Sequence, residues 1–319
     1  MTEALVTARA LRQTFRAARG AEVSAVDGVD LDIEAGRTLA LVGESGCGKT
    51  TLGRMLALLR PPTSGSLRIA GEETTTLSRR GLRAQRRQVQ MVFQDPVAAL
   101  NPRHPVEAIL SEPLENHVPG PRAAHRARIV ELLEAVGLSE RDLRRYPHEF
   151  SGGQRQRITL ARALVLQPAF VVADEPVSAL DVSVQSQILN LLVTLRERFG
   201  LTYLFISHDL AVVHHIADEV AVMYLGRIVE RAPRAVLYDA PAHPYTKALL
   251  ASVPRIRAGK RRLGRVLDGD PPSPLAPPPG CRFHPRCPHA TERCRSEVPR
   301  LRSTESGGVV ACHNAEQIA

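Results

Sequence analysis

The feature that most constrains this 319-residue chain is the stretch GESGCGKT at residues 43–50. It follows the apolar run TLALV and precedes the helical stretch TTLGRMLALL, so a pattern G-x-x-x-x-G-K-T lies between a strand and a helix. In that position backbone amides and a helix N-terminus surround phosphate oxygens, which predicts a nucleoside triphosphate site. The residues expected to contact the nucleotide are Gly43, Glu44, Ser45, Gly46, Cys47, Gly48, Lys49, Thr50 and Thr51.

Lys49 is one of only three lysines in a chain with 39 arginines. A compact ammonium fits the β and γ phosphates inside a tight loop better than the wide planar guanidinium does. The Thr50 hydroxyl is expected to ligate Mg²⁺. We interpret Cys47 as a small filler, because the pattern uses the backbone amide of this position rather than its side chain.

Apolar runs and helical patterns alternate along the chain. Continuous apolar runs that end in turn residues predict strands buried on both faces of a parallel sheet. The sequence VSVQSQILNLLVTLRER has apolar residues at helical spacing and ends at Gly200. This alternation predicts an α/β fold, with a helical insertion at about residues 100–165. The predicted strands are TLALVG (38–43), QMVFQ (90–94), FVVAD (170–174) and TYLFIS (202–207).

Asp174 ends one predicted strand and is followed by Glu175. An Asp at the end of a buried strand can hold Mg²⁺ through water, and an adjoining Glu can act as general base toward the attacking water. Without the phosphate motif, the pair would be interpreted as a cap of the next loop. With it, the pair predicts the hydrolytic centre.

The net charge and the aromatic content of the chain limit the kinds of partner that it is expected to bind. The net charge of +9 and pI near 9.9 are compatible with nucleic acid, an anionic membrane surface or an anionic ligand. The chain has no Trp and few aromatic residues, so stacking platforms for bases are scarce. No run of 18 or more apolar residues and no secretory signal pattern is present, which predicts a cytoplasmic location.

Five motifs in order resemble those of the nucleotide-binding subunits of ABC transporters, and they span about 200 residues. They are GESGCGKT, FSGGQRQR at 150–157, FVVADE, SALD at 178–181 and ISHD at 206–209. The resemblance implies a P-loop NTPase core of the ABC type, in which two ATPase domains form a head-to-tail sandwich. Each ATP then lies between one phosphate loop and the partner's signature residues, which here are Ser151, Gly152, Gly153 and Gln154.

The same resemblance assigns roles to single residues. Gln94 matches the Q-loop, which senses Mg²⁺ and the γ-phosphate, and Asp181 matches the D-loop at the dimer interface. His208 matches the switch histidine that contacts the γ-phosphate. Phe15 resembles the adenine-stacking aromatic, although the stretch between it and the phosphate loop is longer than in compact relatives, and a core Phe is the alternative. Ser151 is also expected to N-cap the helix that follows it.

Longer substrings resemble the ATPase subunits of dipeptide and oligopeptide importers, namely MVFQDPVAALNPR, DEPVSALDVSVQ and HPYTKALLASVP. This branch implies two membrane permease subunits, a second homologous ATPase and an external peptide-binding protein. The chain would then lie peripherally on the cytoplasmic face of the membrane, with no nucleic acid partner. Importers of glutathione or nickel complexes have similar ATPases and are the alternatives. A soluble ABC ATPase acting on nucleic acid or ribosomes is the rival, but the second cassette or long coiled coil typical of that class is missing.

The domain plan follows from these patterns. Residues 1–232 are expected to form the ABC ATPase domain, and residues 233–319 a C-terminal extension of the peptide-importer type. Within the extension, a basic stretch at 255–265 and a Pro-rich linker at 269–280 precede a cysteine cluster at 281–312.

Four late cysteines, Cys281, Cys287, Cys294 and Cys312, have the spacing C-x5-C-x6-C-x17-C. A reducing compartment disfavours disulfides, and four thiolates suit either a 4Fe-4S cluster or zinc. The spacing lacks the paired C-x2-C units typical of zinc, and the resemblance to peptide-importer ATPases implies an iron-sulfur cluster at matching cysteines. Zinc and unmetallated thiols are the alternatives, and His284, His289 and His313 lie near enough in sequence to complicate the ligand count.

Overall fold

The computed structural model describes residues 4–16, 22–252 and 269–318. The basic stretch at 255–265 lies outside these ranges. Two sheets form the centre of the molecule, one of them mixed and eight-stranded and the other antiparallel and four-stranded. The eight-stranded sheet has the order β11-β12-β10-β9-β3-β8-β7-β6, and the antiparallel sheet has the order β2-β1-β4-β5.

The parallel part of the large sheet contains all four strands predicted from the sequence. The pairs β6·β7, β7·β8, β8·β3 and β3·β9 are parallel, whereas β10 and the strands beyond it are antiparallel. The bounds are β3 Thr38–Val42, β6 Val89–Val92, β7 Phe170–Asp174, β8 Thr202–Ser207, β9 Glu219–Tyr224, β10 Arg227–Pro233, β11 Arg302–Ser303 and β12 Val309–Val310. The predicted run 90–94 therefore ends as a strand two residues early, before Phe93 and Gln94.

Successive residues of the buried strands enter two different cores. On β3, Leu39 and Leu41 pack with α1 and the antiparallel sheet, while Ala40 and Val42 pack with the helices of the opposite face. A strand that is covered on both sides has no polar face, which explains why these strands read as continuous apolar runs. The antiparallel sheet consists of β1 Ala4–Arg16, β2 Glu22–Glu34, β4 Ser64–Ile69 and β5 Glu72–Glu73.

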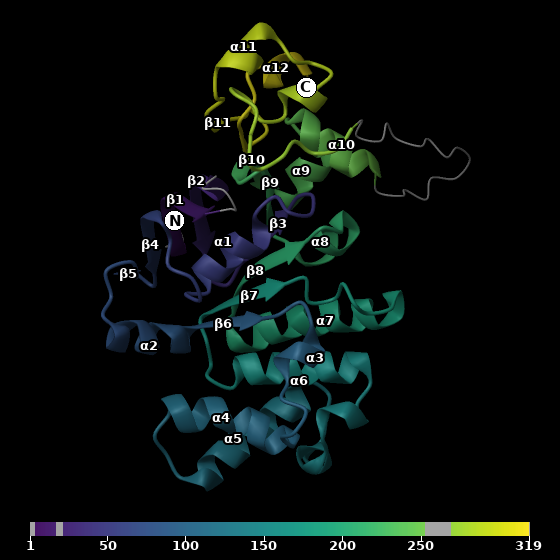
Figure 1. The fold of residues 1–319 in the computed structure, drawn as a ribbon. Helices are drawn as coiled ribbons and strands as arrows, with labels where there is room; N and C mark the ends of the chain where they lie inside the picture. Colours follow the sequence, from purple (N-terminus) through teal and green to yellow (C-terminus); the bar gives the residue numbers. More distant parts are fainter. Residues whose placement is uncertain (1–3, 17–21, 253–268, 319) are drawn as a thin grey trace, which may run out of the picture.

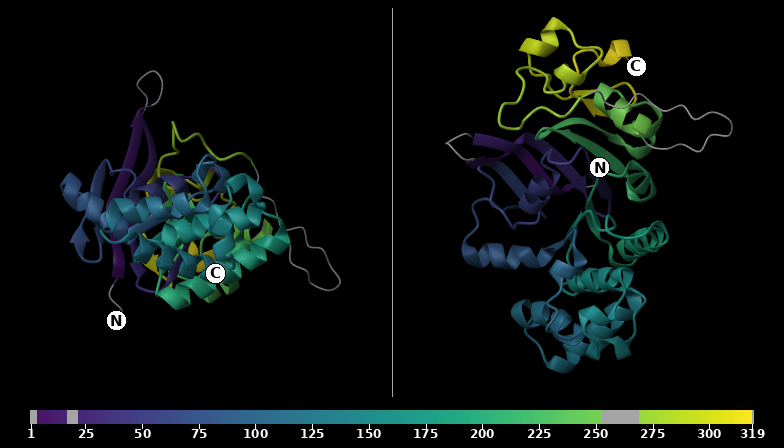
Figure 2. Two further views of the ribbon diagram at one scale, coloured as in Figure 1. Left: turned by 90° about the horizontal axis from the view of Figure 1, so that it is seen from below. Right: turned by 45° about the vertical axis from the view of Figure 1, so that its right-hand side comes forward.

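The helices pack around the two sheets. The predicted helix after Asp181 is α7, which ends as expected where Gly200 adopts a left-handed conformation with φ +63°. The helices α4, α5 and α6 lie at one end of the molecule, while the C-terminal segment lies at the opposite end (Figures 1 and 2). The bounds are α1 Lys49–Leu56, α2 Arg79–Gln88, α3 Pro96–Ala99, α4 Val106–His117, α5 Arg122–Ala135, α6 Gly152–Leu164, α7 Val182–Phe199, α8 Leu210–Ile216, α9 Arg234–Asp239, α10 Pro244–Ser252, α11 Glu292–Ser296 and α12 Ala315–Ile318.

The end of the chain is joined to the large sheet. After the Pro-rich segment, β12 pairs with β10 through Glu230 opposite Val310, and β11 pairs with β12. Among the residues that the structure describes, every helix is too short or too polar to span a bilayer.

Candidate ATP site and cysteine cluster

The phosphate loop connects β3 to α1. Lys49 is buried, and its Nζ donates to the carbonyl oxygens of Gly43 at 2.8 Å and Glu44 at 2.9 Å. Gly48 precedes α1 with φ +110°, and a Cβ on it would lie 2.1 Å from the carbonyl oxygen of Ala25. The loop is thus folded tightly around its own lysine, with a backbone that only glycine tolerates at position 48.

Thr50 and Asp174 bring two oxygen ligands together next to this loop. Thr50 Oγ1 donates to Asp174 Oδ1 at 3.2 Å. Burial raises the pKa of Asp174 above its usual value, and the neighbouring Glu175 acts in the same direction, while the Thr50 hydrogen bond opposes both. A divalent cation would offset the cost of this buried carboxylate, and hydroxyl and carboxylate oxygens are the ligands that Mg²⁺ takes in proteins.

Glu175 lies between two other predicted site residues. Gln94 Nε2 donates to Glu175 Oε2 at 3.1 Å, and His208 Nδ1 lies 3.0 Å from Glu175 Oε1. The three side chains follow the carboxyl ends of β6, β7 and β8, which are adjacent in the parallel sheet. Glu175 itself has φ +46°, a conformation that is uncommon for a residue with a side chain and that clusters at functional sites. The fold therefore assembles a carboxylate, an amide and an imidazole at one edge.

The signature residues form the start of α6. Ser151 Oγ accepts from the N–H of Gln154 at 3.3 Å, and the Gln154 side chain accepts from the N–H of Ser151 at 3.0 Å. The predicted N-cap is confirmed as a reciprocal capping box. A Cβ on Gly153 would lie 2.6 Å from Val184 of α7, so a glycine here lets the two helices approach closely.

Asp181 and Phe15 also have local partners. Asp181 N-caps α7 by accepting from the N–H of Val184 at 2.9 Å, and it is exposed. Phe15, on β1, is half-buried, and the guanidinium carbon of Arg60 lies 4.9 Å from the centre of its ring. One face of that ring is thus covered by a cation.

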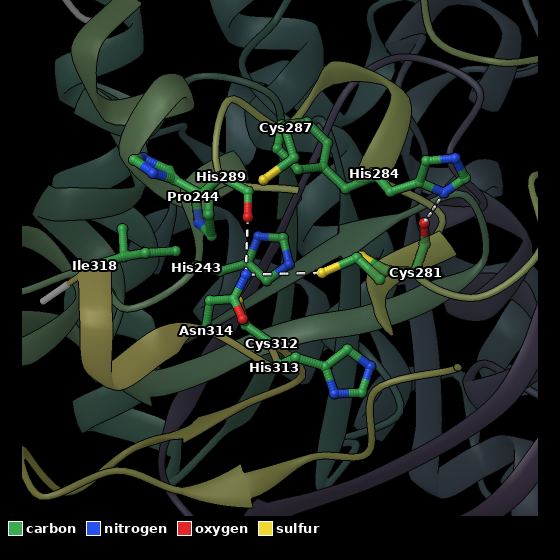
Figure 3. A pocket seen from close by; sticks show the side chains of 12 residues that line it. His243, Pro244, Cys281, His284, Cys287, His289, Cys312, His313, Asn314 and Ile318 are labelled. Carbon is green, nitrogen blue, oxygen red and sulfur yellow. Dashed lines mark hydrogen bonds between the residues drawn. The ribbon is translucent and has the colours of Figure 1, made fainter. Parts of the chain in front are cut away.

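The four late cysteines line one pocket together with His243, and Figure 3 labels Cys281, Cys287 and Cys312 around it. No disulfide joins them. His284 and His313 line the same pocket, and each has a ring nitrogen bonded to a backbone carbonyl, of Cys281 at 3.0 Å and of Glu297 at 3.1 Å. Within residues 4–16, 22–252 and 269–318, no group of three or more His, Cys, Asp or Glu side chains has an arrangement that could hold a metal ion.

Hydrogen-bond donors surround the sulfurs. The backbone N–H groups of Phe283, His289 and Asn314, each two residues after a cysteine, bond to Cys281, Cys287 and Cys312. Thr291 Oγ1 lies 3.3 Å from the sulfur of Cys294, and Asn314 Nδ2 lies 3.8 Å from it. Burial raises the pKa of Cys281 to about 11, and the neighbouring thiols also raise it. For Cys281, Cys287 and Cys312 the backbone donors favour the thiolate form, whereas burial and the neighbouring thiols oppose it.

Sequence reasoning missed the contacts between the C-terminal extension and the ATPase core. Arg286 forms an ion pair with Glu44 of the phosphate loop, and Arg282 forms one with Asp27 of β2. The partners are separated by 242 and 255 positions in the chain. No local pattern links residues so distant, so nothing in the sequence alone could have identified these pairs.

Two family models match the chain. The ABC transporter model matches residues 26–178, and the model for the C-terminal region of oligopeptide and dipeptide transporters matches residues 229–294. Among curated proteins, a di/tripeptide transport ATP-binding protein of Pseudomonas aeruginosa is 53% identical over 99% of this chain and 99% of its own length. An oligopeptide transport ATP-binding protein of Bacillus subtilis is 51% identical over 92% of this chain and 90% of its own length.

Solved structures share the core. A dimeric ATP-binding cassette, MJ0796, in a post-hydrolysis state with ADP and phosphate superposes with a TM-score of 0.65 at 28% identity, covering 72% of this chain and 98% of the other. The cbiO1 protein of Clostridium perfringens, part of an ABC transporter complex, gives a TM-score of 0.67 at 28% identity and covers 75% of this chain and 92% of its own.

Proposed function

The chain belongs to the peptide-transport branch of the ABC transporter ATP-binding proteins, and we propose that it binds and hydrolyses ATP to power the import of dipeptides or oligopeptides. The proposal of ATP hydrolysis rests on the contacts of Glu175. Its two carboxylate oxygens are bonded to Gln94 and His208 beside the phosphate loop. The nearly full-length similarity to peptide-transport subunits supports the transported class.

Each step of hydrolysis has a residue suited to it. Lys49, whose Nζ lies in the loop bonded to the Gly43 and Glu44 carbonyls, binds the β and γ phosphates of ATP together with the loop amides. Glu175 takes the proton of the attacking water, while Gln94 and His208 hold its carboxylate and the water in line. The remaining contacts to the nucleotide are proposed for Gly46, Gly48, Ser45, Cys47, Thr51 and, at the adenine, Phe15.

Mg²⁺ fits the oxygen ligands of Thr50 and Asp174, with Gln94 as the third protein ligand. When bound it neutralises charge on the β and γ phosphates. Asp174 is buried and bonded to Thr50 at 3.2 Å, so the fold brings both oxygens together beside the loop.

Assembly is proposed to complete the site. Ser151, Gly152, Gly153 and Gln154 of a second ATPase subunit would contact the γ-phosphate across a head-to-tail interface, and Asp181 would lie at that interface. The exposure of Ser151, Gly152 and Asp181 is consistent with this role.

Two membrane permeases would dock on the helical region at about 100–165, on the cytoplasmic face of the membrane, and an external binding protein would deliver the peptide. The division into residues 1–232 and 233–319 is part of the same proposal.

We also propose that Cys281, Cys287, Cys294 and Cys312 hold a 4Fe-4S cluster, with zinc as the alternative. The support is a set of four thiols around one pocket, each with a hydrogen-bond donor of the kind that stabilises thiolate ligands. In a short segment with little core of its own, such a group would act as a structural clamp.

The decisive experiment is to copurify the chain with its permeases and partner ATPase and to measure which solutes stimulate ATP hydrolysis. We expect stimulation by a binding protein loaded with dipeptides or oligopeptides. Stimulation only by glutathione or by nickel complexes would reassign the transported class, and ATPase activity that responds to RNA in a salt-sensitive way would contradict the importer assignment.

A further inference from the structure

Two residues of the C-terminal extension hold Glu44 of the phosphate loop. Arg286 Nη1 donates to Glu44 Oε2 at 2.7 Å and Nη2 donates to Oε1 at 3.0 Å, so guanidinium and carboxylate are paired by two parallel bonds. The backbone N–H of Glu44 donates to the hydroxyl of Tyr245 at 2.9 Å. The side chain and the amide of one loop residue are thus both fixed from outside the ATPase core.

This contact is enclosed by the protein. The Arg286 side chain is only 5% exposed and that of Glu44 is 25% exposed. Tyr245 is fully buried, and its ring lies 4.7 Å from that of Tyr224 and 5.4 Å from that of Phe283. An exposed ion pair contributes little, but removing one partner of an enclosed pair leaves an uncompensated charge in a poorly hydrated place.

Glu44 is also bonded to the phosphate-binding lysine. Its carbonyl oxygen accepts from Lys49 Nζ at 2.9 Å. Its carboxylate is a negative charge carried by the loop that must attract the phosphates of ATP, and like charges repel strongly where water is scarce. Arg286 therefore does two things for the loop: it neutralises this carboxylate and keeps it turned toward the C-terminal extension.

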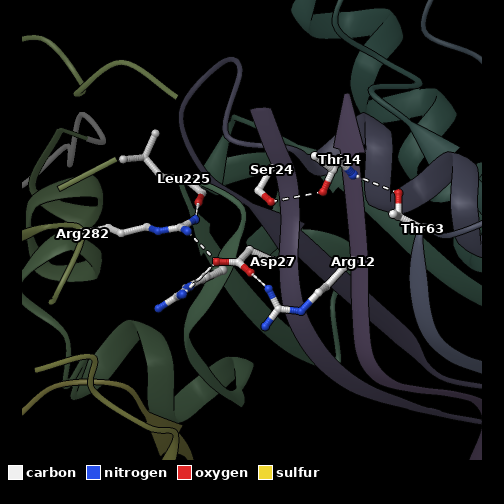
Figure 4. Close-up of polar contacts among 8 residues, drawn as sticks. Arg12, Thr14, Ser24, Asp27, Thr63, Leu225 and Arg282 are labelled. Carbon is white, nitrogen blue, oxygen red and sulfur yellow. Dashed lines mark hydrogen bonds and ion pairs between the residues drawn. The ribbon is translucent and has the colours of Figure 1, made fainter. Parts of the chain in front are cut away.

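A second attachment lies close by, and Figure 4 shows it. Arg282 bonds to Asp27 of β2 and to the carbonyl of Leu225. The next residue, Gly226, donates its N–H to the carbonyl oxygen of Cys47 in the phosphate loop at 2.8 Å. Both arginines belong to the short segment between the first two late cysteines, so that segment is tied to the loop and to the turn that supports the loop.

We propose that Arg286 is a positioning residue of the ATP site, which acts through Glu44 so that the C-terminal extension sets the affinity of the phosphate loop for ATP. The inference rests on the ATP-binding function proposed above and does not depend on which metal the cysteines hold. It goes beyond that function because it gives the extension a direct role in binding the nucleotide.

The test compares the full-length chain with Arg286→Met, Glu44→Gln and the double variant, and it measures the Kd of Mg²⁺-ATP by calorimetry and KM and kcat in the assembled complex. Arg286→Met leaves the carboxylate unpaired, so we expect Kd and KM to rise about tenfold with a smaller change in kcat. Glu44→Gln removes the repulsion as well as the pair, so the double variant should recover most of the lost affinity. The matched control is Arg293→Met, whose ion pair with Glu297 in the same extension is exposed.

The outcomes separate this inference from the proposed function. An unmodified chain that binds no ATP would contradict the function itself. Arg286→Met with the affinity of the Arg293→Met control would overturn the positioning role, and so would a double variant no better than Arg286→Met. If Arg286→Met does not fold, Arg286→Lys serves instead: it keeps the charge but not the paired bonds, and we expect a two- to threefold rise in Kd that Glu44→Gln abolishes.

Discussion

His208 Nδ1 and Glu175 Oε1 lie 3.0 Å apart across the carboxyl ends of β8 and β7. The His208 side chain is 60% exposed, whereas that of Glu175 is only 17% exposed. The carboxylate is therefore held inside the site by a residue that a second subunit could reach. From this contact we predict different effects on ATP hydrolysis when Glu175 and His208 are replaced.

Replacing Glu175 by Gln should lower the rate of ATP hydrolysis by a factor of about 10² to 10⁴, because the amide cannot accept the proton of the attacking water. ATP binding should persist, so that the nucleotide is trapped. Phosphate release and bound nucleotide in the assembled complex measure both effects. Glu72→Gln, on an exposed part of β5, is the control. An unchanged hydrolysis rate would refute the role of Glu175 as general base.

His208→Ala should lower kcat more than it raises KM for ATP, since the ring contacts the carboxylate rather than the loop that binds the phosphates. Steady-state kinetics of the complex separate the two parameters. His215→Ala is a close control, because His215 is also exposed and also has one side-chain hydrogen bond, to Asn190 at 2.8 Å. Equal kinetics for the two variants would show that the contact with Glu175 has no part in hydrolysis.

Gly48→Ala should abolish ATP binding, because the added Cβ would meet the Ala25 carbonyl at 2.1 Å and force the loop to move. Gly36→Ala provides the comparison: its φ is +73°, but nothing lies within 4 Å of the added atom. That variant should lose about 1 kcal/mol of stability from backbone strain alone and bind ATP normally. Calorimetric Kd values and thermal unfolding distinguish the two, and normal ATP binding by Gly48→Ala would contradict the tight loop geometry.

Cys294→Ser should strongly reduce the iron and acid-labile sulfide of anaerobically purified protein, together with absorption near 400 nm. Cys47→Ser should change neither, because Cys47 is buried against the core beside the phosphate loop and outside the cysteine pocket. Elemental analysis compares the two variants. Stoichiometric zinc with no iron in the unmodified protein would show that the cysteines hold zinc and not an iron-sulfur cluster.

Much of the ATPase core could be predicted because its determinants are local. The period of apolar residues and the left-handed Gly200 define α7, and the pattern at Ser151 defines the capping box of α6. The antiparallel sheet could not be predicted in this way, because β1 is irregular. The buried side chains of β1 alternate at Val6 and Ala8 and then resume at Leu11, one residue out of step. At this point the pairing with β2 shifts its register, and Ala10 has φ +46°.

The residues of the candidate site also differ in whether local sequence could predict them. Lys49, Asp174 and Glu175 lie in short motifs, so the sequence alone is enough to predict them as site residues. Arg286 is one of 39 arginines, and only the path of the chain brings it to Glu44. A contact across 242 positions depends on tertiary structure, which periodicity and spacing do not encode.

The pairing of Val309–Val310 with β10 has a consequence for the chain as a whole. Without β11 and β12, β10 would present its unpaired N–H and C=O groups to any other extended chain, as exposed edge strands do. Residues 302–310 thus cover part of an edge that could otherwise pair with a strand of another molecule. A chain cut after residue 252 would expose that edge and would also lack Arg286, so we expect it to self-associate in addition to binding ATP more weakly.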